Sequence, residues 1–209
     1  MQVVVFGANG KVGSKIVQKL LNDGHFVRAF VHSESHLTKN PKLQIIQGDI
    51  HDAKKVADAL DGGNAVISAL GSWGTSSKDI VSSGMISIIP GMKTHGITRI
   101  VSLTGSGARD SLDHPGLLER INRWIIRIVA RKVFDDGEKH IALLRKSKLD
   151  WTVVRSPAMR ESTRNNGFQL SKKSPSPWAS IVRDEVANAV VDLVANKEWR
   201  QAAPYIRQR

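Results

Sequence analysis

The chain opens with a short apolar run that leads directly into three evenly spaced glycines. Residues 3–6 are Val-Val-Val-Phe, and the glycines that follow are Gly7, Gly10 and Gly13. Apolar residues then recur at helical spacing over residues 12–21, and Gly24 ends that segment. This order predicts a buried strand, a tight turn and an amphipathic helix, which together open a parallel α/β sheet.

Apolar runs of strand length continue to alternate with helical patterns as far as residue 155. The further strand candidates are residues 25–31, 43–47, 65–70, 99–103 and 151–155. Alternation of this kind is typical of a parallel sheet with right-handed crossovers. We therefore expect one α/β domain over residues 1–209, a Rossmann-type doubly wound, mostly parallel sheet with helices on both faces.

Three later segments have features that bear on the helices. In residues 79–95, Pro90 predicts a kink or an early end of the helix. A further helix is expected over residues 184–195, followed by a short polar tail with arginines. Asp135 and Asp136 are interpreted as residues near a helix N-terminus, where the helix dipole favours carboxylates.

A basic stripe is expected along the helix predicted for residues 117–134. Its members are Arg120, Arg123, Arg127 and Arg131, while Ile121, Ile125 and Ile128 face elsewhere. The stripe is interpreted as a solvated helix face, with a nucleic-acid or membrane surface as the alternative. Few aromatic residues and no recognition motif accompany it, so we expect no specific nucleic-acid binding.

The glycine turn predicts a phosphate site. A glycine turn after a strand lets the backbone approach a diphosphate, and the following helix start offers unpaired amide donors. The spacing is G-x-x-G-x-x-G, and no Gly-Lys-Ser/Thr follows, so a P-loop is excluded. A turn that only joins strand to helix is the alternative; the surrounding elements favour a dinucleotide site.

The end of the second predicted strand bears on which dinucleotide binds. An acidic side chain there would favour NAD, because it binds the ribose hydroxyls and repels a 2′-phosphate. This chain offers His32 and Ser33 as donors and Lys11 as a nearby cation, although Glu34 follows. NADP(H) is therefore the preferred coenzyme and NAD(H) remains possible. His32 and His36 have metal-like spacing, but they fall in a predicted loop, so no metal is expected.

Charge and composition constrain which ligands, nucleophiles and cellular location we expect for the protein. Lys and Arg number 31 against 19 for Asp and Glu, a net charge of +12 that favours anionic ligands. Cysteine is absent, which excludes a thiolate nucleophile. No export signal or membrane-length apolar run is visible, and a cytoplasmic location is expected.

Several motifs together resemble the atypical short-chain dehydrogenase/reductases, in their NmrA-like and biliverdin-IXβ reductase (flavin reductase) branch. They are FGANGKVG at residues 6–13, IIQGDI at 45–50, VISALG at 66–71, IVSLTGSGA at 100–108, LDWTVVRSPAM at 149–159 and IVRDEVANAV at 181–190. The resemblance covers nearly the whole chain in order. It implies a Rossmann fold that binds NAD(P) and an acceptor pocket formed mainly by the loops after residues 70, 104 and 156.

The resemblance also implies where the coenzyme lies. Asp49 and Ile50 would flank the adenine, Thr104 would lie near the nicotinamide, and the loop at residues 157–159 would border its ring. Together with the glycine turn, the residues expected to contact the coenzyme are Gly7, Asn9, Gly10, Lys11, Val12, His32, Ser33, Asp49, Ile50, Ala69, Leu70, Gly71, Thr104, Pro157, Ala158 and Met159. Ordinary strand-to-helix loops are the alternative interpretation of these positions.

The sequence departs from the wider family in its proton relay. A Tyr-x-x-x-Lys pair is standard there, but the single tyrosine here is Tyr205, without that lysine. Hydride transfer to a conjugated acceptor such as a flavin, quinone or bilin needs mainly positioning and exclusion of water. We therefore expect an NAD(P)H-dependent reductase of such an acceptor, with a non-catalytic NAD(P)-sensing regulatory protein as the alternative.

Few side chains remain as helpers for that chemistry. Thr104 and Ser106 are the catalytic candidates, as hydroxyl donors toward the acceptor, although they could also cap the following turn. Lys139 and His140 are interpreted as a solvated helix face, with a role as distant proton source as the alternative. Trp73 is a candidate wall of the acceptor pocket or a packing residue. The sequence leaves the oligomeric state open.

Overall fold

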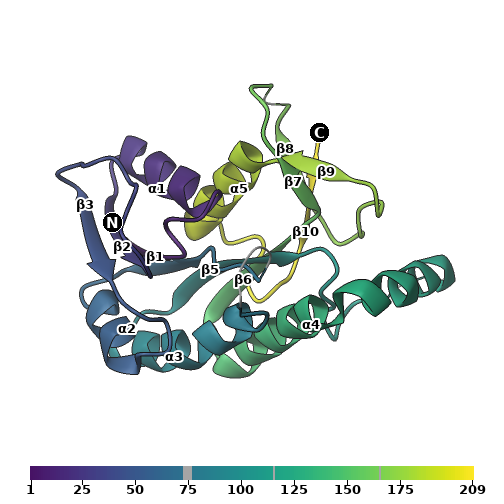
Figure 1. Ribbon diagram of the computed structural model, residues 1–209, viewed down its shortest axis with the longest axis horizontal. Helices are drawn as coiled ribbons and strands as arrows, with labels where there is room; N and C mark the ends of the chain where they lie inside the picture. Colours follow the sequence, from purple (N-terminus) through teal and green to yellow (C-terminus); the bar gives the residue numbers. More distant parts are fainter. Residues whose placement is uncertain (73–76, 115, 165) are drawn as a thin grey trace.

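The structure is a computed structural model that describes residues 1–72, 77–114, 116–164 and 166–209, with the side chains of residues 117–130 left out of the description. Its centre is an eight-stranded sheet in the order β3-β2-β1-β4-β5-β6-β10-β8 (Figure 1). The bounds are β1 Gln2–Phe6, β2 Phe26–Val31, β3 Leu43–Gln47, β4 Ala65–Ser68, β5 Arg99–Gly105, β6 Asp150–Ser156, β8 Phe168–Ser171 and β10 Tyr205–Gln208.

The sheet is parallel from β3 to β10, and only β8 runs antiparallel to its neighbour β10. The strand order reverses between β1 and β4, which is the switch point where ligands bind in doubly wound sheets. A separate parallel pair is formed by β7 Ala158–Arg160 and β9 Ser180–Val182.

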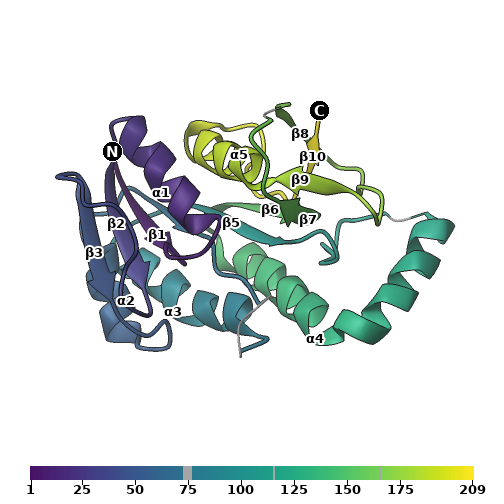
Figure 2. The same cartoon turned by 45° about the horizontal axis from the view of Figure 1, so that its top comes forward.

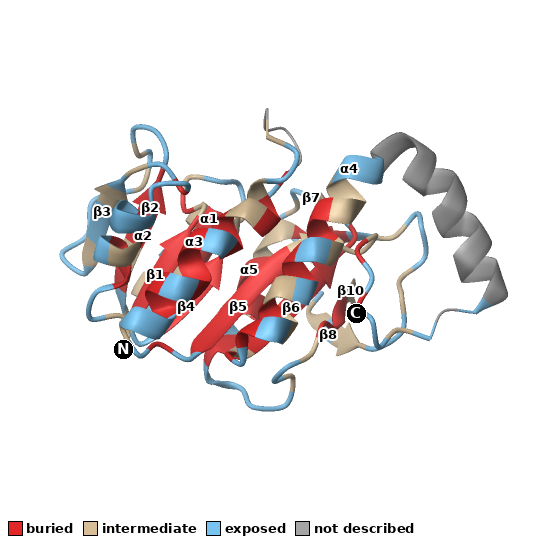
Figure 3. Ribbon diagram, turned by 90° about the horizontal axis from the view of Figure 1, so that it is seen from below, coloured by how far each residue is buried: buried red, intermediate tan, exposed pale blue. Residues whose placement is uncertain are grey.

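Helices cover both faces of the sheet. On one face lie α1 Gly13–Asn22 and α5 Arg183–Ala195; on the other lie α2 Ala53–Leu60, α3 Ile80–Thr94 and α4 Leu117–Ser147 (Figures 1 and 2). Each face has its own apolar core, because successive strand residues point to opposite sides. Figure 3 shows the central strands buried behind helices whose outward faces are exposed. The predicted Rossmann-type fold is confirmed.

The C-terminal tail is a strand, so its prediction as a polar tail was wrong. Tyr205 and Ile206 are 2% and 0% exposed, and β10 inserts between β6 and β8. The partners of this four-residue strand come from residues 150–156 and 168–171, so the pairing that defines it is remote in sequence. Local pattern therefore gave no indication of it.

Helix α3 continues through Pro90 to Thr94, so of the two predicted alternatives, a kink or an early end, the early end is wrong. Proline removes one amide donor and leaves the carbonyl four residues earlier without its helical partner. That residue, Ile86, is 67% exposed, and Pro90 is itself on the exposed side of the helix. Solvent on this face limits the cost of the interruption.

Like Asp135, Asp136 does not lie at a helix N-terminus as predicted, because α4 is one helix that runs from Leu117 to Ser147. Instead its carboxylate is 2% exposed and caps a different helix. The backbone N–H of Ser82 donates to Oδ1 at 2.7 Å, that of Val81 donates to Oδ2 at 3.2 Å, and the hydroxyl of Ser72 also donates to Oδ2. Asp136 therefore ties α4 to the start of α3 and to the loop before it.

His140 is also not on a solvated face, although Lys139 beside it is exposed. The imidazole is 0% exposed, and its Nε2 lies 2.9 Å from the hydroxyl of Ser102 on β5. Burial lowers the pKa of His140 from 6.5 to about 4, while the nearby carboxylate of Asp136 opposes that shift. At neutral pH His140 is an uncharged core residue, which disfavours it as a proton source.

The predicted basic stripe falls mostly outside the described side chains: those of Arg120, Arg123, Arg127 and the three isoleucines are not described. Arg131 is exposed and lies 3.6 Å from Asp135 in an i, i+4 ion pair. Within the described residues, no helix is long and apolar enough to cross a membrane.

Burial of His140 predicts an acid-sensitive fold. The unfolded chain takes up a proton near pH 6.5, whereas the folded chain resists it until about pH 4, so stability falls as the pH drops through this window. The expected loss is about 3 kcal/mol. Chemical unfolding of the wild type and His140→Gln at a series of pH values should show this extra loss only in the wild type.

The exposed His36 provides the control for this measurement. The His36→Gln variant should follow the wild-type pH profile, because the His36 side chain is exposed to solvent in the folded chain as it is in the unfolded one. A wild type and a His140→Gln variant whose unfolding free energies differ by the same amount at pH 7 and pH 4 would contradict the assignment.

Candidate functional site

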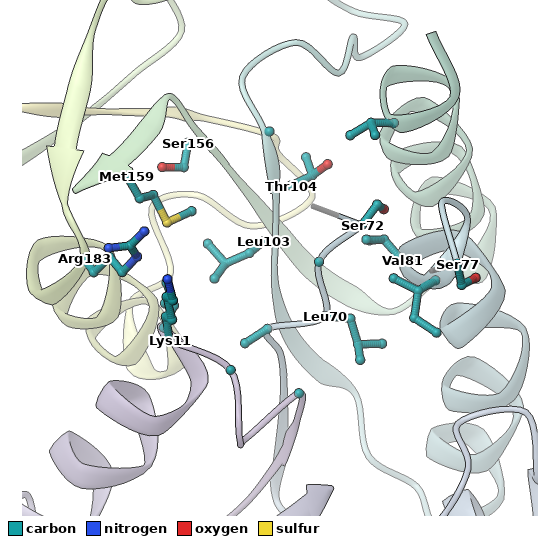
Figure 4. A pocket seen from close by; sticks show the side chains of 18 of the residues that line it. Lys11, Leu70, Ser72, Ser77, Val81, Leu103, Thr104, Ser156, Met159 and Arg183 are labelled. Atoms are coloured by element: carbon teal, nitrogen blue, oxygen red, sulfur yellow. The ribbon is translucent and has the colours of Figure 1, made fainter. Parts of the chain in front are cut away.

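One cleft runs along the carboxyl ends of the strands. Its volume is about 1670 Å³, and it is lined by residues that follow β1, β2, β3, β4, β5 and β6. Small-molecule pockets commonly measure about 300–1,000 Å³, so the cleft has room for a dinucleotide and a second ligand. Figure 4 shows part of its lining, with Lys11, Met159 and Arg183 on one side and Ser72, Val81 and Ser77 on the other.

The glycine turn is held by very close backbone contacts. Gly7 has φ +75°, and a Cβ there would lie 2.8 Å from the carbonyl oxygen of Ala69 at the end of β4. A Cβ on Gly13 would lie 2.1 Å from the carbonyl oxygen of Gly7. At Gly10 the corresponding contact is 3.1 Å, which is tight but less severe. Backbone packing alone therefore requires glycine at positions 7 and 13.

The start of α1 is suited to an anion. No side chain caps this helix, and its first turn contains no acidic residue. Helix α2 contrasts with it, because Asp52 accepts hydrogen bonds from two of its first amides. The exposed Lys11 lies just before α1, and no ion-pair partner for it is recorded in the described part of the chain. Uncapped amides, the helix dipole and this cation together favour a phosphate.

The loops after β2 and β3 form the next part of the cleft. Asn9 joins the glycine turn to the β2 loop, because its Nδ2 donates to the carbonyl oxygen of Glu34 at 2.9 Å. His32 and Ser33 line the cleft from that loop, and both are exposed. Asp49 lies 2.9 Å from the imidazole of His51; the backbone N–H of His51 lowers the pKa of the carboxyl, and the imidazole adds to this.

The far part of the cleft is lined by hydroxyls and apolar groups. Thr104 at the end of β5 and Ser106 in the next loop are partly exposed. Among the described residues neither hydroxyl has a recorded hydrogen-bond partner, so the turn caps considered as an alternative are not found. The loop is fixed by its backbone instead, as the N–H of Ser106 donates to the carbonyl of Ser156 at 2.7 Å. A Cβ on Gly105 would meet nothing within 4 Å.

The structure brings all the predicted site residues together along this one cleft. They are Gly7, Asn9, Gly10, Lys11, Val12, His32, Ser33, Asp49, Ile50, Ala69, Leu70, Gly71, Thr104, Ser106, Pro157, Ala158 and Met159. Their contacts with a coenzyme stay a prediction. Trp73 lies outside the described residues.

Other lining residues were missed from the sequence. They are Phe30, Val31, Gly48, His51, Ser72, Ser77, Ile80, Val81, Leu103, Gly105, Gly107, Val133, Phe134, Ser156, Ser174, Pro175, Ser176, Pro177 and Arg183. Proline and serine at residues 174–177 are typical of a loop, but the sequence alone does not show that this loop, which precedes β9, reaches the cleft. Arg183 stands within the quoted motif at residues 181–190 without having been assigned a role.

The single tyrosine lies away from the cleft. Tyr205 is 2% exposed, its hydroxyl accepts a hydrogen bond from Nη1 of Arg155 at 2.9 Å, and its ring lies under the same guanidinium. Nη2 of Arg155 in turn donates to Asp113 at 2.9 Å. Tyr205 is therefore part of a buried polar network and does not line the cleft.

A glycine turn and an uncapped helix start at the switch point of a Rossmann-type sheet form the arrangement that binds dinucleotides. A family model described as NAD(P)H-binding matches residues 7–197. The chain belongs to this NAD(P)H-binding family.

Individual relatives cover the chain to different extents. A 3 beta-hydroxysteroid dehydrogenase/Delta 5-->4-isomerase of Mycobacterium tuberculosis is 46% identical over 61 residues, which are 29% of this chain and 16% of that protein. ChuY, an anaerobillin reductase from Escherichia coli O157:H7, has a similar fold, with a TM-score of 0.78 at 18% identity over 100% of this chain and 97% of ChuY. A short-chain dehydrogenase/reductase of Veillonella parvula in complex with NADP gives 0.78 at 17% identity over 99% and 94%.

Gly13 and Gly105 are expected to respond differently to substitution by alanine. Gly13→Ala forces a Cβ against the Gly7 carbonyl, so its unfolding free energy should fall by about 1–3 kcal/mol. Gly105→Ala places its Cβ where no described atom lies, so its stability should stay within about 0.5 kcal/mol while binding of a cleft ligand weakens. Urea unfolding and NADPH titration measure the two effects. Equal destabilisation by both variants would contradict this geometry.

Proposed function

We propose that the protein is an NAD(P)H-dependent oxidoreductase that reduces a conjugated acceptor, such as a flavin, quinone or bilin-like molecule, by direct hydride transfer. The observation that carries the proposal is one continuous cleft. At one end it contains the glycine turn and the uncapped start of α1, and its other end is lined by hydroxyls and apolar side chains. The anaerobillin reductase and the NADP complex among the structural neighbours are consistent with it.

The residues present fit a dinucleotide. The helix start and Lys11 would hold the diphosphate, His32 and Ser33 would face the adenosine ribose, and Asp49 would lie near the adenine. Donors from the β2 loop and the absence of an acidic side chain at its first two positions favour NADP(H) over NAD(H). The loops after residues 70, 104 and 156 would form the acceptor pocket, as the single-domain prediction for residues 1–209 assumed.

The bound nicotinamide coenzyme supplies the hydride. The chain's own contribution is to position the acceptor and to limit access of water. Thr104 and Ser106 would donate hydrogen bonds to the acceptor, where charge grows as it is reduced. A Tyr-x-x-x-Lys relay has no part in this proposal, since Tyr205 is buried beside Arg155. A conjugated acceptor spreads the incoming charge and can take its proton from solvent.

The hydroxyl pair gives a test of these roles. A Thr104→Val, Ser106→Ala double variant should lower kcat for an accepted flavin or quinone by about tenfold or more, because donors to developing charge act mainly in the transition state. The NADPH dissociation constant should change much less. The measurement is NADPH oxidation across a panel of flavins, quinones and bilins, followed by kcat and KM for the best acceptor.

Tyr205→Phe serves as the matched control. It removes a hydroxyl from the buried network and should lower stability while leaving kcat unchanged. A large fall in kcat for folded Tyr205→Phe would contradict the proposed mechanism. Tight NADPH binding without oxidation by any acceptor would instead favour the regulatory sensor.

A further inference from the structure

Arg183 lies in the cleft at a fixed backbone position. It follows β9, whose Ile181 and Val182 are 0% exposed and pair with β7. The residue begins α5, and its side chain is 18% exposed. Figure 4 shows Arg183, Lys11 and Met159 on the same side of the cleft. The fold therefore places a rigidly anchored arginine where a ligand would lie.

The guanidinium of Arg183 is only partly satisfied by the protein. Its Nη1 donates to Glu161 Oε1 at 2.9 Å, and that glutamate side chain is 58% exposed. Within the described residues its Nη2 and Nε have no recorded partner, and neither is a buried atom. A single ion pair with an exposed partner contributes little to folding stability, so this contact does not account for the position of Arg183.

Lys15 shows what a satisfied cation in the same cluster looks like. Its ammonium lies 3.0 and 3.1 Å from the two carboxylate oxygens of Asp184. Its distance to the nearest carboxylate oxygen of Glu161 is longer, at 3.5 Å. The hydrogen bond that the Lys15 ammonium donates to Asp184 is the main cause of the raised pKa of Lys15. Asp184 is thus paired with Lys15. Arg183 and Lys15 both contact the exposed Glu161.

The charges that line the cleft favour an anion at Arg183. Lys11 has no ion-pair partner among the described residues. The carboxylate in the described lining of the cleft is that of Asp49, and it is paired with His51. Lys11 and Arg183 line the same partly apolar cleft, where like charges repel, and an anion bound between them reduces that cost. Arginine also presents a planar fork that matches phosphate and carboxylate oxygens.

We propose that Arg183, acting with Lys11, binds an oxyanion group, a phosphate or a carboxylate, of a ligand in the cleft. The inference rests on the proposed function only in taking this cleft as the ligand site. The oxyanion belongs either to the coenzyme diphosphate or to an acidic group on the acceptor. In the second case the acceptor is an acidic conjugated molecule.

Two titrations distinguish these sources. The first measures the dissociation constant of NADPH; the second measures those of FMN and riboflavin, with and without NADP⁺, because these flavins differ by one phosphate. Arg183→Gln should weaken either NADPH or FMN by about tenfold or more. Riboflavin binding should change less than twofold. The control is Arg160→Gln, an equal charge change at an exposed position outside the cleft lining.

A second variant separates binding from support of the fold. Glu161→Gln removes the carboxylate that competes for Arg183, so it should strengthen binding of the same ligand. If Arg183 serves only the ion-pair cluster, Glu161→Gln should weaken binding as Arg183→Gln does. Thermal unfolding of each variant checks folding, and Arg183→Lys should retain part of the affinity.

These experiments distinguish failure of the Arg183 inference from failure of the proposed reductase function. Equal effects of Arg183→Gln and Arg160→Gln on both NADPH and FMN would overturn the inference, as would weakened binding in Glu161→Gln. NADPH that binds with a clear Arg183 effect but is never oxidised would leave the inference standing and refute the reductase. Absence of both NADPH and FMN binding in the wild type would refute both.

Discussion

The contact between Gly13 and the carbonyl of Gly7 is the constraint on which the site depends. An added Cβ would come within 2.1 Å of that oxygen, so the first turn of α1 lies directly on the turn that leaves β1. The other side of the turn rests on the end of β4 through Gly7. Because β1 and β4 flank the switch point, this contact fixes the uncapped helix start at the place where the sheet opens into the cleft.

The elements that sequence predicted well are those whose signal is local. The first strand, its glycine turn and α1 follow from a run of apolar residues and glycine spacing, and residues 43–47 were predicted with the bounds that the structure has. The predicted site residues lie at strand ends, and the carboxyl ends of parallel strands meet along one edge of a sheet. The predicted fold class was therefore enough to place these residues in one cleft, without any knowledge of side-chain contacts.

What could not be predicted depends on pairs remote in sequence. Asp136 looked like a helix-start residue because its charge suits one; it does cap a helix start, but that of α3, 54 positions away. His140 follows polar residues in a helix, and only its approach to Ser102 on β5 reveals a buried side chain. The strand β10 and the reach of the loop at residues 174–177 into the cleft likewise require the assembled sheet.

These remote contacts bear on the part of the cleft that we propose for the acceptor. Asp136 holds Ser72 and Val81, which both line it, while Gly107 packs so close to Phe134 that a Cβ would lie 2.0 Å from the ring. Helix α4 therefore fixes two walls of the cleft, the loop before α3 and the loop after β5. The part of the cleft proposed for the coenzyme is built from local sequence around the glycine turn, whereas the part proposed for the acceptor is built from tertiary contacts. That difference explains why the sequence indicates the coenzyme class more directly than the acceptor.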